Sequence, residues 1–202
     1  MRFSKLLAAL LTLSFTSCAS GETELVKPSG EFAEIETDQT EAAVAKLAKR
    51  DKQTLDAVKS SPGNFAPPAL YAAADLLMKL HKENEALTYF YLGQLRARSD
   101  VNKSLDPSAR AAIDVLNERY GPPINKYAFS NVEKLKEAVS AVLRLDRELP
   151  RNYDPRWVAL HGMQAFTKSN VQFRPETEWK TIDEKTRKDY RSGFQQAMKS
   201  LE

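Results

Sequence analysis

Few side chains in this sequence are suited to metal binding or nucleophilic catalysis: two histidines and a single cysteine, Cys18. His81 lies among charged residues in an expected turn, where water would solvate it. His161 follows Trp157 by four residues, as expected for a histidine at the edge of a core. Zinc sites need three or four such ligands, and the segment after His81 lacks the second histidine of a metalloprotease helix. The sequence therefore predicts no metal site.

Paired carboxylates are the remaining candidates for catalysis. Glu83 with Glu85, and Asp183 with Glu184, could act as a general acid and base, although acidic residues on helix faces are more often simply solvated. The sequence contains no Gly-x-Ser-x-Gly nucleophile motif, no phosphate-binding loop and no dinucleotide-binding fingerprint. We therefore expect no cofactor and no catalytic residue. A hydrolase of the cell envelope that uses unrecognised carboxylates is the alternative hypothesis.

Arginine and tyrosine residues indicate binding to another protein. Tyr91 and Arg98 are seven residues apart, roughly 10.5 Å along a helix, so they share one helical face. Exposed tyrosine beside arginine is typical of residues that contribute most to protein–protein binding. We therefore predict that Tyr91, Arg96, Arg98 and Arg156 bind a partner. The structural alternative is that Arg96 and Arg98 complement the dipole at a helix C-terminus, and that Trp157, next to Arg156, belongs to the core.

The N-terminal segment predicts where the chain resides. Arg2 and Lys5 precede an apolar run of about ten residues, which is too short to cross a bilayer. Small residues then lead into Cys18. This arrangement resembles the signal peptide of bacterial lipoproteins, in which the cysteine is lipidated as the signal is removed. Phe15 stands where that motif usually has leucine, and an ordinary secretory signal is the alternative.

The lipoprotein resemblance implies that residues 1–17 form the signal peptide and that Cys18 carries the lipid. Because Ala19 and Ser20 follow the cysteine, it also implies an outer-membrane anchor that faces the periplasm. Without residues 1–17 the chain has 28 basic and 27 acidic residues. A protein so close to neutral has no field that would hold nucleic acid. We therefore expect contact with the membrane through the lipid and no nucleic-acid partner.

The rest of the chain divides into a tether and a folded domain. Residues 18–37 contain several glutamates, glycine and proline and few large apolar residues, which is typical of a flexible segment. Residues 38–202 predict a single all-α domain of about seven helices, because apolar residues recur at helical spacing and no segment alternates as a strand would. Gly121-Pro122-Pro123 is expected to end one helix, and Ser130 with Glu133 to form a capping box at the start of the next. The expected helices cover residues 38–59, 67–80, 86–98, 107–120, 131–148, 155–166 and 183–198.

Residues 70–98 resemble one helical hairpin of the tetratricopeptide repeat. The first helix has the repeat's large–small–small–large pattern and the second has its small–aromatic–small pattern, in Leu70, Ala73, Ala74, Leu77, Ala86, Phe90 and Gly93. His81 stands in the turn where the repeat usually has glycine, and Arg98 stands at its terminal proline position. The resemblance implies a helical module of the kind that binds other proteins.

Residues 89–98 and 122–128 also resemble a group of bacterial envelope proteins, some of which act as immunity proteins against toxins from neighbouring cells. This resemblance implies a protein partner in the periplasm. The partner is a toxin in the immunity form of the hypothesis and an envelope component in a scaffold form. No catalytic residues follow from the resemblance.

Overall fold

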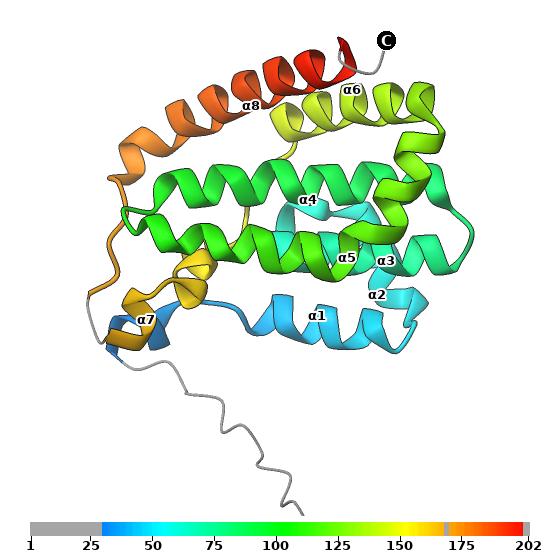
Figure 1. The fold of residues 1–202 in the computed structure, drawn as a ribbon. Helices are drawn as coiled ribbons and strands as arrows, with labels where there is room; N and C mark the ends of the chain where they lie inside the picture. Colours follow the sequence, from blue (N-terminus) through cyan, green and yellow to red (C-terminus); the bar gives the residue numbers. More distant parts are fainter. Residues whose placement is uncertain (1–29, 168–169, 200–202) are drawn as a thin grey trace, which may run out of the picture.

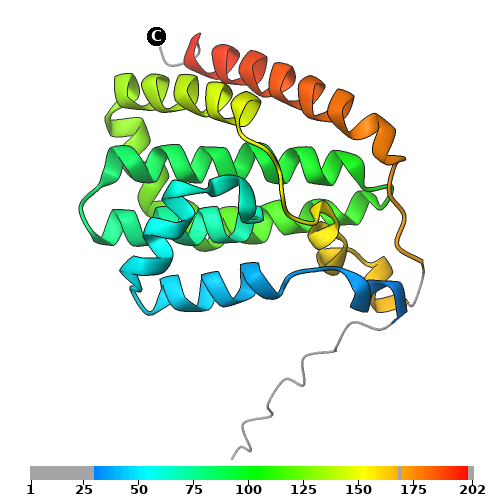
Figure 2. The ribbon, with the colours of Figure 1, turned by 180° about the vertical axis from the view of Figure 1, so that it is seen from behind.

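The computed structural model describes residues 30–167 and 170–199, which Figures 1 and 2 show from opposite sides. The described residues form eight α-helices and four short 3-10 helices, and their only β-type pairing is an isolated bridge between Ser104 and Phe173. The prediction of a single all-α domain is therefore confirmed. The predicted signal peptide, the predicted lipidation site at Cys18 and residues 18–29 of the predicted tether lie outside the described residues.

The long helix α4 (Glu83–Lys103) is the centre of the fold. It contacts α3 (Pro67–Lys79) and α5 (Ala111–Ser130) on one side, and α6 (Val132–Glu148) and α8 (Glu176–Lys199) on the other (Figure 1). Helix α1 (Asp38–Ala48) packs against α3 and forms the outermost layer. The short elements are α2 (Lys52–Ser60), α7 (Gln164–Thr167), η1 (Gly30–Glu34), η2 (Pro62–Asn64), η3 (Pro107–Arg110) and η4 (Pro155–His161).

Helices α3 and α4 form the hairpin that the sequence predicts for residues 70–98, and all seven residues of its pattern are buried. His81 in the turn has a φ of 56°, a left-handed conformation that glycine adopts more readily. Gly93 lies so close to α3 that a Cβ there would be 2.9 Å from Cδ2 of Tyr71. Phe90 packs edge-on against Tyr71, with 4.9 Å between the ring centroids. The absent side chain at position 93 thus makes room for the aromatic contacts.

Helix α5 continues through Gly121-Pro122-Pro123, where the sequence predicted its end. Proline bends a helix because it lacks an N–H donor and its ring crowds the preceding turn. The axis of α5 accordingly changes direction in its second half, which rises toward α6 (Figure 1). Both prolines are exposed, while Tyr120 and Ile124 on either side of them are buried and hold the two halves against the core.

Other helix boundaries also differ from the prediction. The first expected helix divides at Arg50, which has a φ of 62°, into α1 and α2. Residues 155–166 form η4 and the start of α7 instead of one α-helix, and α8 begins at Glu176, before the predicted start near Asp183. Ser130 is the last residue of α5, and the N-cap of α6 is Asn131, which makes no side-chain capping hydrogen bond.

Residues 30–37 belong to the fold, so the prediction of a tether extending to residue 37 is wrong for this part. Phe32 and Ile35 are buried together with Ala159, and the Glu31 carboxylate accepts a hydrogen bond of 2.9 Å from the backbone N–H of Val171. The two apolar side chains dock the segment on η4. Among the described residues, none of the helices combines the length and apolar character needed to cross a membrane.

Truncation of Phe90 tests the hairpin core. We expect Phe90→Ala to lower the free energy of unfolding by about 3–5 kcal/mol, because it leaves a cavity beside Tyr71. Phe129→Ala is the matched control, since Phe129 is 59% exposed and its truncation should cost well under about 1 kcal/mol. Urea unfolding followed by circular dichroism measures both. Equal stability of the two variants would show that Phe90 is not part of the core.

Candidate functional site

Of the four arginine and tyrosine residues that the sequence predicts as partner-binding, the structure brings only Tyr91 and Arg98 to one face. Arg98 is exposed, but the Arg96 side chain is fully buried, so the prediction that Arg96 is available at the surface is wrong. Two residues along a helix are about 200° apart, which turns Arg96 inward when Arg98 faces outward. Tyr91 is only 9% exposed, and its hydroxyl donates a hydrogen bond of 3.4 Å to Oδ1 of Asn125. Arg156 forms a local ion pair of 2.7 Å with Asp154.

Arg96 is part of a buried ionic network centred on Asp146 of α6. Arg96 donates to Oδ1 of Asp146 over 3.2 Å, Arg151 donates to the same oxygen over 2.8 Å, and Arg187 of α8 donates to Oδ2 over 3.0 Å. Burial raises the pKa of Asp146, but the three guanidinium groups outweigh it and hold the pKa below its ordinary value. The carboxylate therefore stays ionised and joins α4, α6 and α8.

A second buried carboxylate, Asp100, lies one turn after Arg96 on α4. Its Oδ2 accepts hydrogen bonds of 3.0 Å from Trp157 and from the Tyr153 hydroxyl, and its Oδ1 is 3.2 Å from the Lys103 ammonium. Burial raises the pKa of Asp100 in spite of its cationic neighbours. The sequence contained a signal for this arrangement that we did not use: Arg96, Asp100 and Lys103 follow the spacing i, i+4, i+7 of a single helix face.

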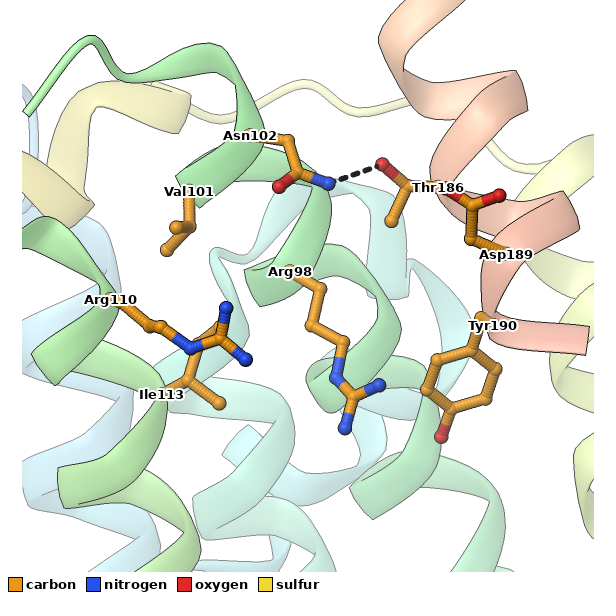
Figure 3. A pocket seen from close by; sticks show the side chains of 8 residues that line it. All are labelled: Arg98, Val101, Asn102, Arg110, Ile113, Thr186, Asp189 and Tyr190. Carbon is orange, nitrogen blue, oxygen red and sulfur yellow. Dashed lines mark hydrogen bonds between the residues drawn. The ribbon is translucent and has the colours of Figure 1, made fainter. Parts of the chain in front are cut away.

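The exposed Arg98 lines a pocket between α4, α5 and α8, with a volume of about 190 Å³ (Figure 3). The lining residues are Arg98, Val101 and Asn102 from α4, Arg110 and Ile113 at the start of α5, and Thr186, Asp189 and Tyr190 from α8. The guanidinium groups of Arg98 and Arg110 point into the same space (Figure 3). Within residues 30–167 and 170–199, neither of them forms an ion pair with a carboxylate.

Hydrogen bonds between helices fix the position of Arg98. Its guanidinium carbon lies 5.1 Å from the centroid of the Tyr190 ring, a cation–π contact. The Tyr190 hydroxyl donates to Oε1 of Gln94 over 3.0 Å, and Nε2 of Gln94 donates to Oδ1 of Asn117 over 3.2 Å. Burial raises the pKa of Tyr190 far above its ordinary value, with Arg98 as a smaller opposing influence, so the hydroxyl keeps its proton. This chain of bonds connects α8, α4 and α5.

An apolar groove of about 440 Å³ adjoins the pocket and shares Arg98 and Tyr190 with it. The bent second half of α5 contributes Phe129 to the groove, and α8 contributes Phe194 and Met198. Among residues 30–167 and 170–199, no carboxylate lines this groove. We call the pocket and the groove together the α4–α8 face. Tyr91 and Arg98 do lie on this face together, as their spacing predicts, although Tyr91 is largely buried.

The residues considered for catalysis and metal binding lie elsewhere. Asp183 is paired with Lys103 over 2.9 Å and with Arg151 over 3.0 Å, whereas its neighbour Glu184 is exposed. Glu83 and Glu85 lie in the first turn of α4. His161 packs edge-on against Trp157, which is buried, as the sequence predicts for the tryptophan and histidine. Among the described residues there is no group of three or more histidine, cysteine, aspartate or glutamate side chains placed to hold a metal ion.

Replacement of Asp146 tests the ionic network. Asp146→Asn removes the carboxylate that the fully buried Arg96 shares with the largely buried Arg151 and Arg187, so we expect the free energy of unfolding at pH 7 to fall by about 3–5 kcal/mol. Because the folded pKa of Asp146 is lowered, its stabilisation is complete above the unfolded pKa of about 3.9 and disappears as the pH falls through the folded value. The variant should therefore lose less stability than the wild type as the pH falls below about 4.

Urea unfolding at a series of pH values measures both effects. Asp189→Asn is the matched control, because Asp189 forms an ion pair with Lys185 at the surface, where such pairs contribute little. If Asp146→Asn were as stable as Asp189→Asn at pH 7, the network would not hold the three helices together.

Comparisons with known proteins give no match to this chain among protein-family models, curated protein sequences or solved structures. The resemblances to bacterial lipoproteins, to the tetratricopeptide repeat and to envelope immunity proteins therefore stay predictions from the sequence.

Proposed function

We propose that the protein is a non-enzymatic, lipid-anchored module of the bacterial cell envelope that binds another protein in the periplasm. Cys18 carries the lipid, and the α4–α8 face receives the partner. The observation that carries the binding part of this proposal is the coincidence, on one face, of two arginines that pair with no carboxylate of the described residues and an apolar groove lined by Phe129, Phe194 and Met198.

The chemistry of the face matches that of protein interfaces. Arginine, aromatic residues and methionine are enriched where proteins bind each other, and the residues that contribute most cluster in preformed pockets. Phe129 is the most exposed of the aromatic residues that line the groove, and its position depends on the bend of α5. Hydrogen bonds from Tyr190 to Gln94 and on to Asn117 hold the arginine side of the face in place before a partner arrives. A preformed site loses little entropy when it binds.

Two forms of this function agree with the sequence. In the immunity form the partner is an imported toxin, whereas in the scaffold form it is another component of the envelope.

The alternative from a different class is a cell-envelope hydrolase. That hypothesis needs two carboxylates with raised pKa in one concave site. In the part of the chain that the structure describes, Asp189 is the only carboxylate that lines the α4–α8 face, and it is exposed and paired with Lys185.

Truncation of Phe129 tests the binding face. We expect the full-length chain to co-purify with a specific envelope protein, and Phe129→Ala to weaken that complex by about 2 kcal/mol, or roughly thirtyfold, since it removes an aromatic contact from the groove. Val115→Ala is the matched control, because Val115 also projects from α5, is 48% exposed and does not line the groove. Affinity purification of each variant from the host envelope, followed by titration with the purified partner, gives the comparison.

The three possible results differ clearly. Loss of the partner with Phe129→Ala alone supports the proposal. Equal binding by wild type and both variants would contradict the assignment of the groove as the binding face. If Val115→Ala weakened the complex as much as Phe129→Ala, the partner would bind another surface of α5.

Replacement of Cys18 tests the anchor. We expect Cys18→Ser to move the protein from the membrane to the soluble fraction while its thermal unfolding stays unchanged, because residues 30–199 contain the hydrophobic core. Fractionation of cells and a high-salt wash of the membranes measure the distribution. Ser20→Ala is a control that keeps the cysteine. A Cys18→Ser protein that still sedimented with washed membranes would show that the lipid is not the anchor.

A further inference from the structure

The pocket between Arg98 and Arg110 is too small for a complete small-molecule ligand. Its volume of about 190 Å³ lies below the roughly 300–1,000 Å³ that is usual for such sites. It is nevertheless large enough for one polar group and a few waters, each of which occupies about 30 Å³. The groove of about 440 Å³ continues from it on the other side of Arg98 and Tyr190. A polar group in the pocket would therefore belong to a longer ligand that extends into the groove.

The pocket has an excess of positive charge. Arg98 and Arg110 come from different elements and point their guanidinium groups into the same space (Figure 3). Asp189 lines the pocket as well, but its carboxylate points away from both guanidinium groups in Figure 3 and is 2.6 Å from the Lys185 ammonium. Two like charges that share a cavity repel each other unless an anion lies between them.

Two of the neutral polar residues of the pocket, Asn102 and Thr186, bind each other. Nδ2 of Asn102 donates a hydrogen bond of 2.8 Å to Oγ1 of Thr186, which is drawn in Figure 3. The Thr186 oxygen faces Asn102 and lies away from the two guanidinium groups in Figure 3. The pocket thus offers two guanidinium forks to an anion. Guanidinium groups bind planar oxyanions through two parallel hydrogen bonds.

We infer that this pocket binds a side-chain carboxylate of the partner protein, and that an apolar side chain next to it in the partner lies in the groove. The inference rests on the proposed function and specifies the ligand chemistry of the same face. A singly charged carboxylate fits two guanidinium groups beside the exposed Asp189 better than a doubly charged phosphate, which the aspartate would repel more strongly. The adjoining groove accounts for an apolar neighbour, because Phe129, Phe194 and Met198 line it.

A pair of short peptides tests the inference directly. The probe is the acetylated, amidated tetrapeptide Leu-Phe-Ala-Glu, and its control is the same peptide with glutamine in place of glutamate. The full-length chain, labelled with ¹⁵N, is titrated with each peptide while the arginine Nε–Hε resonances are followed by NMR. We expect saturable shifts for Arg98 and Arg110 with the glutamate peptide, and affinity lower by roughly tenfold or more with the glutamine peptide.

Matched variants identify the residues responsible. Arg98→Gln with Arg110→Gln should reduce affinity for the glutamate peptide by roughly tenfold or more. Arg119→Gln is the control, because Arg119 is also exposed and also lies 5.1 Å from a tyrosine ring, that of Tyr120, but does not line the pocket. Its affinity for the peptide should be unchanged. Thermal unfolding of each variant verifies that the fold is retained.

Several results would overturn the inference. One is equal affinity of the chain for the glutamate and glutamine peptides. Another is that Arg119→Gln lowers the affinity for the glutamate peptide as much as the double variant does. The third is that inorganic phosphate binds at Arg98 and Arg110 more tightly than the glutamate peptide. If the envelope partner still bound the double variant while Phe129→Ala lost it, the module would stand as proposed and only the carboxylate assignment would fail. If neither variant lost the partner, the proposed binding face itself would be wrong.

Discussion

Three guanidinium groups converge on one buried carboxylate, and the arrangement of the helices depends on this contact. Asp146 of α6 binds Arg96 of α4, Arg151 in the segment after α6, and Arg187 of α8. A buried charge that loses its partner incurs the full cost of desolvation. The helices therefore cannot slide along each other without breaking these ion pairs at that cost. The contact therefore specifies the register of α4, α6 and α8 more than it adds to stability.

Helix α8 depends on this polar contact more than the other long helices do. Its buried residues are few, namely Thr186, Tyr190 and Met198, whereas α3 and α4 are anchored by many apolar residues. Arg187 joins α8 to Asp146, and Asp183 joins it to Lys103 and Arg151. Thr186 and Tyr190, which line the pocket, flank Arg187 on the same helix. The geometry of the proposed binding face is thus set by the ionic network beneath it.

The sequence predicts the all-α fold and the hairpin well, because both depend on local spacing. The burial of Phe90 and Gly93 follows from the small–aromatic–small pattern. The sequence was less informative about Arg96, since charged residues are rarely fully buried and its partner Asp146 lies fifty residues away. The continuation of α5 past Pro122 and Pro123 was also missed, because packing on both sides of the bend overrides the local preference of proline. Arg110 could not be assigned to the site without knowing that it shares a pocket with residues of α4 and α8.

If Cys18 carries the proposed lipid, the docking of Phe32 and Ile35 limits how far the domain can stand from a membrane. The described chain begins at Gly30, at the corner of the fold near α7 and away from the layer of α6 and α8 (Figures 1 and 2). Twelve residue steps separate Gly30 from Cys18, and even a fully extended chain of that length reaches only about 40 Å. A lipid at Cys18 would therefore confine the domain to a thin layer next to the bilayer. A partner attached to the same membrane, or emerging from it, would encounter the α4–α8 face at a much higher effective concentration than a freely diffusing protein.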